Sequence, residues 1–371
     1  MTGKFDAHPA QVELAKVFSS VRLLGPPMGD KVVKLVAHLF TPEEAEIAKH
    51  LPFYNPKPLE KIVRKSGRDP GLIKPILDEM ARRRVIYGGD SGYSLLPLIP
   101  GMFEYLLMSG ADSDWHRKYA ELLNDMFSTG YMREYTSGAI PAVRNIPVQN
   151  VIEGKSRVVD ADLMSEMIDR HDELAMLNVC QCRQSMHLAG HECKRATPQD
   201  GCLVFGSFAQ SSVDSDSGRA VSKEEMRDIV TERWEKKLVF LTGNVSPSSP
   251  NAICTCCDCC CHFLETINNY GGKNLVAPPH YVVQVDDSLC DDCGRCSLVC
   301  NTYAHAYEDK KHYYDPAKCV GCGICVDSCK RDAIKMVENP SYKPPAKDFQ
   351  RLGLKLLPTT ALTGLKVKLS R

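Results

Sequence analysis

The sequence has no long apolar run, and this absence limits where the protein can reside. No stretch approaches the roughly 18 consecutive apolar residues that a transmembrane helix requires. Residues 1–10 lack the apolar segment of a secretory signal peptide. We therefore expect a cytoplasmic protein without a transmembrane span, in a compartment that keeps thiols reduced.

The sequence also lacks an excess of either charge and a nucleotide-binding fingerprint. Its 46 Lys and Arg residues balance 46 Asp and Glu residues, so no overall field selects nucleic acid or an anionic membrane. No G-x-G-x-x-G follows a predicted strand, and nothing else resembles a flavin or dinucleotide site. Any basic patch must therefore be local.

Cysteine, in contrast, is abundant, with 18 residues in a chain of 371. Disulfides are rare in reducing compartments, so this number of thiols indicates metal binding. Eight of them form a repeat in which three cysteines at intervals of three are followed by a fourth: Cys290, Cys293, Cys296 and Cys300, then Cys319, Cys322, Cys325 and Cys329. Structural zinc sites usually pair two C-x-x-C units instead, which makes zinc the weaker interpretation here.

The repeat resembles that of two-cluster bacterial ferredoxins. The resemblance implies two [4Fe–4S] clusters with exchanged fourth ligands: Cys290, Cys293, Cys296 and Cys329 for one, and Cys319, Cys322, Cys325 and Cys300 for the other. Gly294, Gly321 and Gly323 suit loops in which backbone N–H groups approach sulfur. The chain departs from the family at Asn301 and Lys330, where proline usually follows the fourth cysteine.

The other ten cysteines lie upstream in two groups: Cys180, Cys182, Cys193 and Cys202, then Cys254, Cys256, Cys257, Cys259, Cys260 and Cys261. The first group has the ligand count for one tetrahedral metal or one cubane, and spacing does not choose between them. His187 and His191 are alternative ligands, and Arg183 could donate hydrogen bonds to a negatively charged cluster.

The second group could serve two sites from one short segment. On a helical period, Cys254, Cys257 and Cys261 share one face, and Cys256, Cys259 and Cys260 share the opposite face. In an extended segment, adjacent cysteines also point to opposite sides. We expect two further [4Fe–4S] clusters here, and a single larger or non-cubane cluster fits the spacing as well.

The N-terminal region has the pattern of a winged helix-turn-helix domain. Helices are predicted around residues 32–39, from a Thr41/Glu44 capping box to residue 50, over 59–65, and from Asp69 to Arg84, with Pro75 at an awkward position. A hairpin follows at 85–96. Residues 56–84 contain nine basic residues against four acidic ones, which fits DNA binding or a solvated face of a protein-docking module. Few side chains that could read base edges lie near the start of the helix from Asp69 to Arg84, which would be the recognition helix. We therefore favour protein docking.

Further elements are predicted along the remaining chain. Residues 100–127 should form one or two helices, 131–160 a crossing with short strands, and 162–177 a helix. A capped helix is expected at 222–234, a buried strand at 238–241, and a helix that ends at Gly271. Residues 339–371 read as a tail that either docks a partner or membrane surface or is poorly ordered.

These predictions combine into an α+β protein. Residues 1–110 would form a winged-helix-like domain, 111–275 a cysteine-rich α/β iron–sulfur domain, 276–338 a two-cluster ferredoxin domain, and 339–371 the tail. The cysteine motifs together resemble a family of multi-cluster [4Fe–4S] proteins from anaerobic bacteria. The resemblance implies an electron carrier that serves a partner oxidoreductase. Two other functions fit the sequence: a redox-sensing transcription regulator, and an enzyme whose upstream cluster binds substrate.

Overall fold

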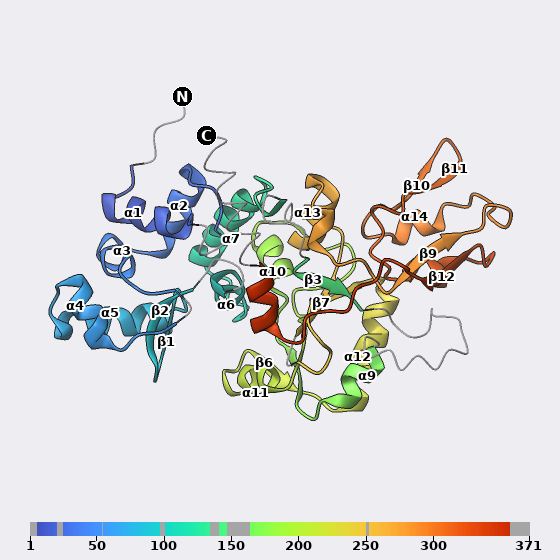
Figure 1. The fold of residues 1–371 in the computed structure, drawn as a ribbon. Coiled ribbons are helices and arrows are strands. Elements are labelled where there is room, and N and C mark those ends of the chain that lie inside the picture. The colour runs from blue at the N-terminus through green and yellow to red at the C-terminus, as the bar shows by residue number, and fades with distance from the viewer. Residues whose placement is uncertain are drawn as a thin grey trace. The chain divides into compact units, whose positions relative to one another are not determined.

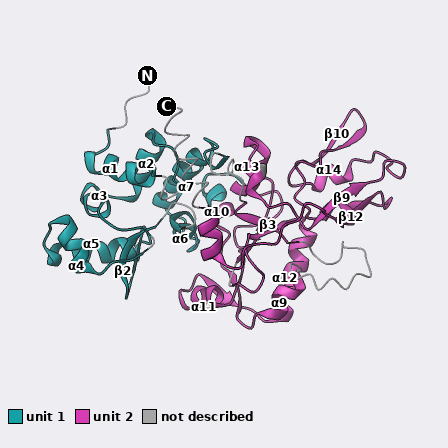
Figure 2. Ribbon diagram, in the orientation of Figure 1, with its two compact units in different colours: residues 1–135, 184–191, 360–371 teal, residues 136–183, 192–359 magenta. Residues whose placement is uncertain are grey.

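The computed structural model describes residues 6–20, 25–53, 55–96, 101–133, 141–146, 164–249 and 252–356. The chain divides into two compact units (Figure 2). The first unit comprises residues 1–135, 184–191 and 360–371, and the second comprises 136–183 and 192–359. The finer division at residues 110, 275 and 338 stays a prediction.

The first unit consists of helices and one hairpin (Figure 1). Its helices pack α1 against α2 and α3, and α2 against α7. In chain order the elements are α1 (Pro9–Phe18), α2 (Asp30–Leu39), α3 (Pro42–Ala48), α4 (Leu59–Ser66), α5 (Pro70–Arg82), β1 (Ile86–Gly89), β2 (Gly92–Leu95), α6 (Phe103–Leu107) and α7 (Asp114–Phe127).

Local signals set the ends of these helices. Thr41 and Glu44 form the predicted capping box of α3. Asp69 caps α5 by accepting hydrogen bonds from two backbone N–H groups, and Pro75 lies inside this continuous helix rather than at its start. Gly67, with φ of 68°, ends α4 in the left-handed conformation that glycine adopts without strain. The predicted order of helices and hairpin is therefore present in this unit.

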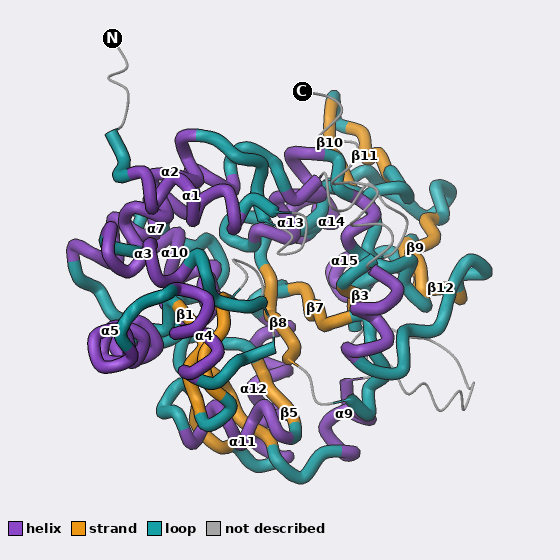
Figure 3. Tube along the Cα trace, turned by 60° about the vertical axis from the view of Figure 1, so that its left-hand side comes forward, coloured by secondary structure: helices purple, strands orange, loops and turns teal. Residues whose placement is uncertain are grey.

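The second unit contains a six-stranded sheet with the order β3-β7-β8-β5-β4-β6. Strands β3, β5, β7 and β8 of this sheet are labelled in Figure 3. Every pair in it is antiparallel. The strands are β3 (Val143–Asn145), β4 (Leu174–Leu177), β5 (Leu203–Phe205), β6 (Gly218–Ala220), β7 (Val239–Gly243) and β8 (Ala252–Cys256). The helices are α9 (Met164–Arg170), α10 (Gln181–Leu188, whose last five residues belong to the first unit), α11 (Ser207–Asp214), α12 (Lys223–Glu235), α13 (His262–Tyr270) and the 3-10 turn Lys273–Leu275.

Two predictions for this region are wrong. The expected helix over 162–177 ends at Arg170, and Leu174–Leu177 is a strand between β5 and β6, because hydrogen bonding to neighbouring strands outweighs local helical preference. The middle segment is also not an α/β domain, since its sheet is antiparallel rather than parallel. The mixture of helix and antiparallel sheet agrees with the α+β class.

The last part of the second unit is built from two antiparallel two-stranded sheets and two short helices. Strand β9 (Tyr281–Val285) pairs with β12 (Ile334–Glu338), and β10 (His305–Glu308) pairs with β11 (Lys311–Tyr314). Helices α14 (Arg295–Val299) and α15 (Ile324–Ser328) each begin after a glycine in the left-handed conformation, Gly294 and Gly323. Each helix therefore starts inside one cysteine triple.

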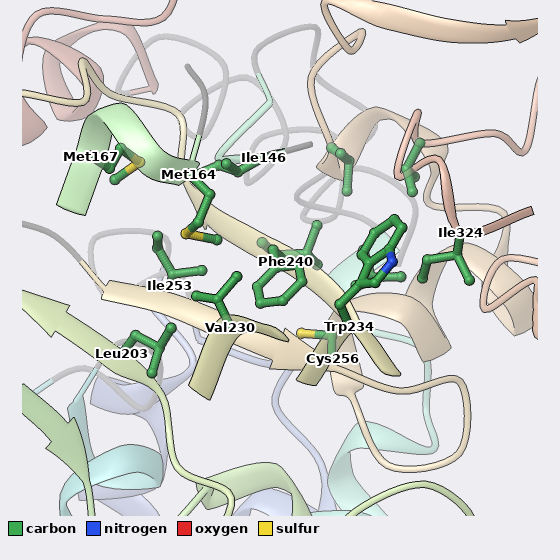
Figure 4. Close-up of a cluster of buried hydrophobic side chains, with 14 of the residues drawn as sticks. Ile146, Met164, Met167, Leu203, Val230, Trp234, Phe240, Ile253, Cys256 and Ile324 are labelled. Atoms are coloured by element: carbon green, nitrogen blue, oxygen red, sulfur yellow. The ribbon is translucent and has the colours of Figure 1, made fainter. Parts of the chain in front are cut away.

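One hydrophobic core joins this last part to the antiparallel sheet (Figure 4). Phe240 of β7 and Trp234 of α12 belong to the same buried cluster as Ile324 of α15. Two ligand-type cysteines, Cys256 and Cys325, also belong to it. Burial of about 25 cal/mol per Å² of apolar surface therefore holds both cysteine-rich segments in one folding unit.

Beyond the core, Ala346 of the expected tail forms a β-bridge with Val245, and Leu352 packs against the same residue. Residues 357–371 of that tail lie outside the described residues, as do residues 147–160 of the expected crossing. None of the described helices has both the length and the apolar character needed to cross a bilayer.

Candidate metal centres

The first ferredoxin-type triple lines a cavity together with the distant Cys329. Cys290, Cys293 and Cys296 come from the loop that leads into α14, and Cys329 follows α15. The structure thus brings together the four cysteines that the ferredoxin resemblance assigned to one cluster.

The second triple lies near Cys300. Charge on Cys300 raises the pKa values of Cys319, Cys322 and Cys325, although burial is the larger cause for each of them. The pKa of Cys322 rises to about 12. Thiolates at this buried site therefore need a cation such as cluster iron to compensate their charge.

One glycine of these loops, Gly321, has the role that the sequence suggested. The backbone N–H of Gly321 points at Cys319 Sγ, with an N to S distance of 3.4 Å. A Cβ at Gly321 would lie 2.2 Å from the carbonyl oxygen of Tyr281, so no other residue fits there. Hydrogen bonds of this kind stabilise negative charge on cluster sulfur.

A histidine pair stands beside the first cavity. His312 Nδ1 lies 3.9 Å from Cys290 Sγ, and its Nε2 lies 2.8 Å from His305 Nδ1. Burial, aided by the charge of His312, lowers the pKa of His305 to about 4, so its ring is neutral at physiological pH. These histidines were not among the predicted site residues, because they lie on β10 and β11 and come close only through the pairing of those strands.

Four of the upstream cysteines form one compact group. Cys193 Sγ lies 3.6 Å from Cys257 Sγ and 3.7 Å from Cys259 Sγ, and the Cys259 and Cys260 sulfur atoms are 3.6 Å apart. All four sulfur atoms lie within 4.8 Å of one another. The N–H of Lys194 also approaches Cys259 Sγ at 3.4 Å. We call Cys193, Cys257, Cys259 and Cys260 the four-thiol group.

The other six upstream cysteines line an adjoining cavity, whose wall also includes Cys257 and Cys260. The sulfur atoms of Cys202 and Cys254 are 3.6 Å apart, and those of Cys256 and Cys261 are 3.2 Å apart. We call this set the six-thiol pocket; its members are Cys180, Cys182, Cys202, Cys254, Cys256 and Cys261. Neither His187 nor His191 belongs to a compact group of ligand atoms among the described residues.

The segment from Cys254 to Cys261 serves two sites, but the expected division of its thiols is wrong. Cys256 groups with Cys254 and Cys261, whereas Cys257 groups with Cys259 and Cys260. The cause is that this segment is neither one helix nor one strand. It changes from strand β8, which ends at Cys256, through a turn to α13, which begins after Cys261.

Arg183 is almost completely buried beside the upstream cysteines, with an exposed fraction of 1%. Its guanidinium donates to the carbonyl oxygens of Asp200, at 2.8 Å, and Thr255. Burial alone would lower its pKa, but the surrounding thiolates, first Cys180 and then Cys257, raise it. A permanent positive charge here favours anionic metal–thiolate centres, whereas hydrogen bonds from Arg183 to a cluster, which the sequence suggested, stay a prediction.

Asn301 binds the turn of the four-thiol group to the ferredoxin-type segment. Its side chain is buried, accepts a hydrogen bond from Asp258 N at 3.1 Å and donates to Lys237 O at 2.8 Å. Its carbonyl oxygen accepts from Asn268 Nδ2 at 3.0 Å. Proline at this position, which the ferredoxin family usually has, would lack the amide group that makes the side-chain contacts.

Comparison with known proteins finds an iron–sulfur family in the C-terminal segment. Residues 312–335 match the model of the 4Fe-4S binding domain. A pyruvate synthase subunit PorD from Methanothermobacter marburgensis is 42% identical over 52 residues, which are 14% of this chain and 60% of that protein. The ferredoxin oxidoreductase 1 subunit ForD from Aquifex aeolicus is 37% identical over 67 residues, which are 16% of this chain and 85% of that subunit.

An archaeal-type glutamate synthase [NADPH] from Thermotoga maritima is 38% identical over 64 residues, or 17% of this chain. The match spans only 13% of that enzyme's length. No solved structure matches the chain. The shared feature is therefore a 4Fe–4S ferredoxin domain, found in subunits or parts of oxidoreductases.

Proposed function

We propose that this chain, which belongs to the 4Fe–4S ferredoxin family, relays single electrons between its metal centres and a partner oxidoreductase. Two [4Fe–4S] clusters would be held by the ferredoxin cysteines, each with a fourth ligand from the other triple. The observation that carries the proposal is the cavity at the first triple, in which Cys329 joins Cys290, Cys293 and Cys296.

The upstream cysteines extend this proposal toward a longer relay. The turn that holds the four-thiol group is hydrogen-bonded through Asp258 to Asn301, which directly follows Cys300. A second contact joins the Tyr303 hydroxyl to the Asp258 carboxylate at 3.2 Å. Metal centres upstream would therefore be linked by a few bonded residues to a ligand of the ferredoxin module, which suits an internal electron path.

The first unit is proposed to dock the partner protein rather than DNA. Several of its basic side chains are already engaged: Lys74 pairs with Asp78, Arg82 with Glu79 and Arg83 with Glu44. The exposed surface of α5 also presents Leu72, with an exposed fraction of 71%. An exposed apolar side chain near acidic residues favours a protein surface over phosphates.

The proposal is tested by anaerobic purification of the full chain, with iron and sulfide analysis and paramagnetic resonance during stepwise reduction. We expect at least two clusters that each accept one electron and return it to a one-electron acceptor. In the Cys300→Ser variant, the signal of the cluster bound by Cys319, Cys322 and Cys325 should change, while that of the other cluster should persist. Absence of sulfide, or damage confined to the Cys290 cluster, would contradict the proposal.

A further inference from the structure

The four-thiol group differs in size from every other cysteine set in the described chain. Its sulfur atoms all lie within 4.8 Å of one another, with measured separations of 3.6, 3.7 and 3.6 Å. Such short separations carry information about the metal, because ligand spacing depends on whether the ligands share one metal ion or bind different ones.

Four thiolates around a single ion must lie close together. With metal–sulfur bonds of about 2.3 Å and tetrahedral angles, neighbouring sulfur atoms are about 3.8 Å apart. In a [4Fe–4S] cube each cysteine binds a different iron, so the four thiolates surround four metal ions and must stand much further apart. The observed separations agree with the single-ion geometry.

The ferredoxin-type cysteines provide an internal comparison. Among the described residues, no three cysteines of either ferredoxin set have their sulfur atoms within 4.8 Å of one another. The six-thiol pocket has short sulfur pairs, 3.6 Å between Cys202 and Cys254 and 3.2 Å between Cys256 and Cys261, but no three of its sulfur atoms lie within 4.8 Å of one another. Among the described cysteines, a set of four with every sulfur atom close to the other three is therefore confined to the four-thiol group.

We propose that Cys193, Cys257, Cys259 and Cys260 hold one tetrahedral metal ion, zinc or iron, and not a [4Fe–4S] cluster. The inference refines the upstream part of the proposed function and replaces one of the two further cubes that the sequence suggested. Four thiolates around a divalent ion carry two net negative charges. The Lys194 N–H approaches Cys259 Sγ, and the turn carries two cations, Lys194 and Arg195, against the single carboxylate of Asp258.

An ion bound by the four-thiol group would connect two distant segments of the chain. Cys193 lies in the segment between α10 and β5, whereas its three partners lie in the turn between β8 and α13. One ion would therefore join two segments more than 60 residues apart, at the turn that Asn301 binds. Zinc would hold this junction rigid, and iron would in addition accept an electron beside the ferredoxin module.

The test compares the full-length protein with its Cys193→Ala variant after identical anaerobic preparation. The proposal predicts that the variant loses one metal ion per chain and no acid-labile sulfide, because a single-ion site contains none. Loss of about four irons together with about four sulfides would show a cube, and an unchanged metal content would show no site at all; either result overturns the proposal. The His191→Ala variant, at a nearby histidine outside the group, should keep the ion.

X-ray absorption at the metal edge provides a second readout that does not depend on the variant. If the ion is zinc, the zinc edge should show about four sulfur neighbours near 2.3 Å and no neighbouring metal. If it is iron, the same protein should contain no zinc and should show the resonance of an isolated high-spin ferric ion when oxidised. A protein that contains no zinc and in which cubes account for every iron would refute the inference. If the proposed ferredoxin clusters are absent, the sulfide content will be low in both the full-length protein and the Cys193→Ala variant. This result is distinguishable from failure of the single-ion inference, which concerns the difference between the two proteins.

Discussion

The His312→Phe variant should lower the reduction potential of the cluster at Cys290 without affecting the other ferredoxin cluster. A metal-bound thiolate carries no proton, so the contact between His312 Nδ1 and Cys290 Sγ requires that the ring nitrogen donates. His312 Nε2 then accepts the proton of His305 Nδ1 at 2.8 Å. Phenylalanine keeps a ring that can stack on His305, from which the His312 centroid is 5.0 Å away, but it removes the donor.

The size of the shift in reduction potential follows from the strength of the hydrogen bond between His312 and Cys290. Bonds to charged groups contribute about 1.5–3 kcal/mol, and the donor–acceptor distance of 3.9 Å is long even for sulfur. The reduction potential depends only on how much stronger this hydrogen bond is in the reduced cluster, which is more negative, than in the oxidised cluster. We take this difference in hydrogen-bond energy as about 0.5–1 kcal/mol. Since about 1.4 kcal/mol corresponds to 59 mV for one electron, the variant should be about 20–40 mV lower.

The assay is an anaerobic redox titration followed by paramagnetic resonance, in which the two clusters are resolved. Tyr313→Phe is the matched control, because Tyr313 directly follows His312 on strand β11 and its side chain is half exposed. That variant should leave both potentials unchanged. A potential that rises in His312→Phe, or an equal shift of both clusters, would refute the assigned donor.

Three further predictions concern stability and binding. Asn301→Ala leaves the buried Asp258 N–H and a facing carbonyl without partners, so anaerobic urea unfolding should show a loss of about 2–4 kcal/mol, whereas exposed Asn274→Ala should lose almost nothing. Burial, and then the hydrogen bond to Asp78, raise the pKa of Tyr93 to about 12, so the neutral phenol stabilises the fold below pH 10. The free energy of unfolding should therefore fall as the pH rises from 10 toward 12. Thermal melts of a Tyr93→Phe variant should lack this loss. Fluorescently labelled duplex DNA should show no sub-micromolar, salt-sensitive and sequence-dependent binding to the full chain, and such binding would favour the regulator function.

Local structure was largely predictable because its signals lie within a few residues of each other. Thr41 with Glu44, Asp69 before Pro70, and Gly271 after α13 each set a helix end through contacts that span one turn. Leu174–Leu177 could not be recognised as a strand, because its partners, β5 and β6, lie 25 or more residues away in sequence.

The amino-acid sequence by itself indicated which cysteines are candidate metal ligands and identified the ferredoxin repeat, since the spacing of Cys290, Cys293 and Cys296 suits a chain that wraps around one cluster corner. Only the tertiary structure decided how the upstream cysteines are divided. The change from strand β8 through a turn to α13 places the Cys256 sulfur against that of Cys261 and the Cys257 sulfur against that of Cys193, although the two residues are adjacent in sequence. The separations between sulfur atoms, which depend on how distant segments pack, likewise carry the information about metal type that spacing along the chain does not contain.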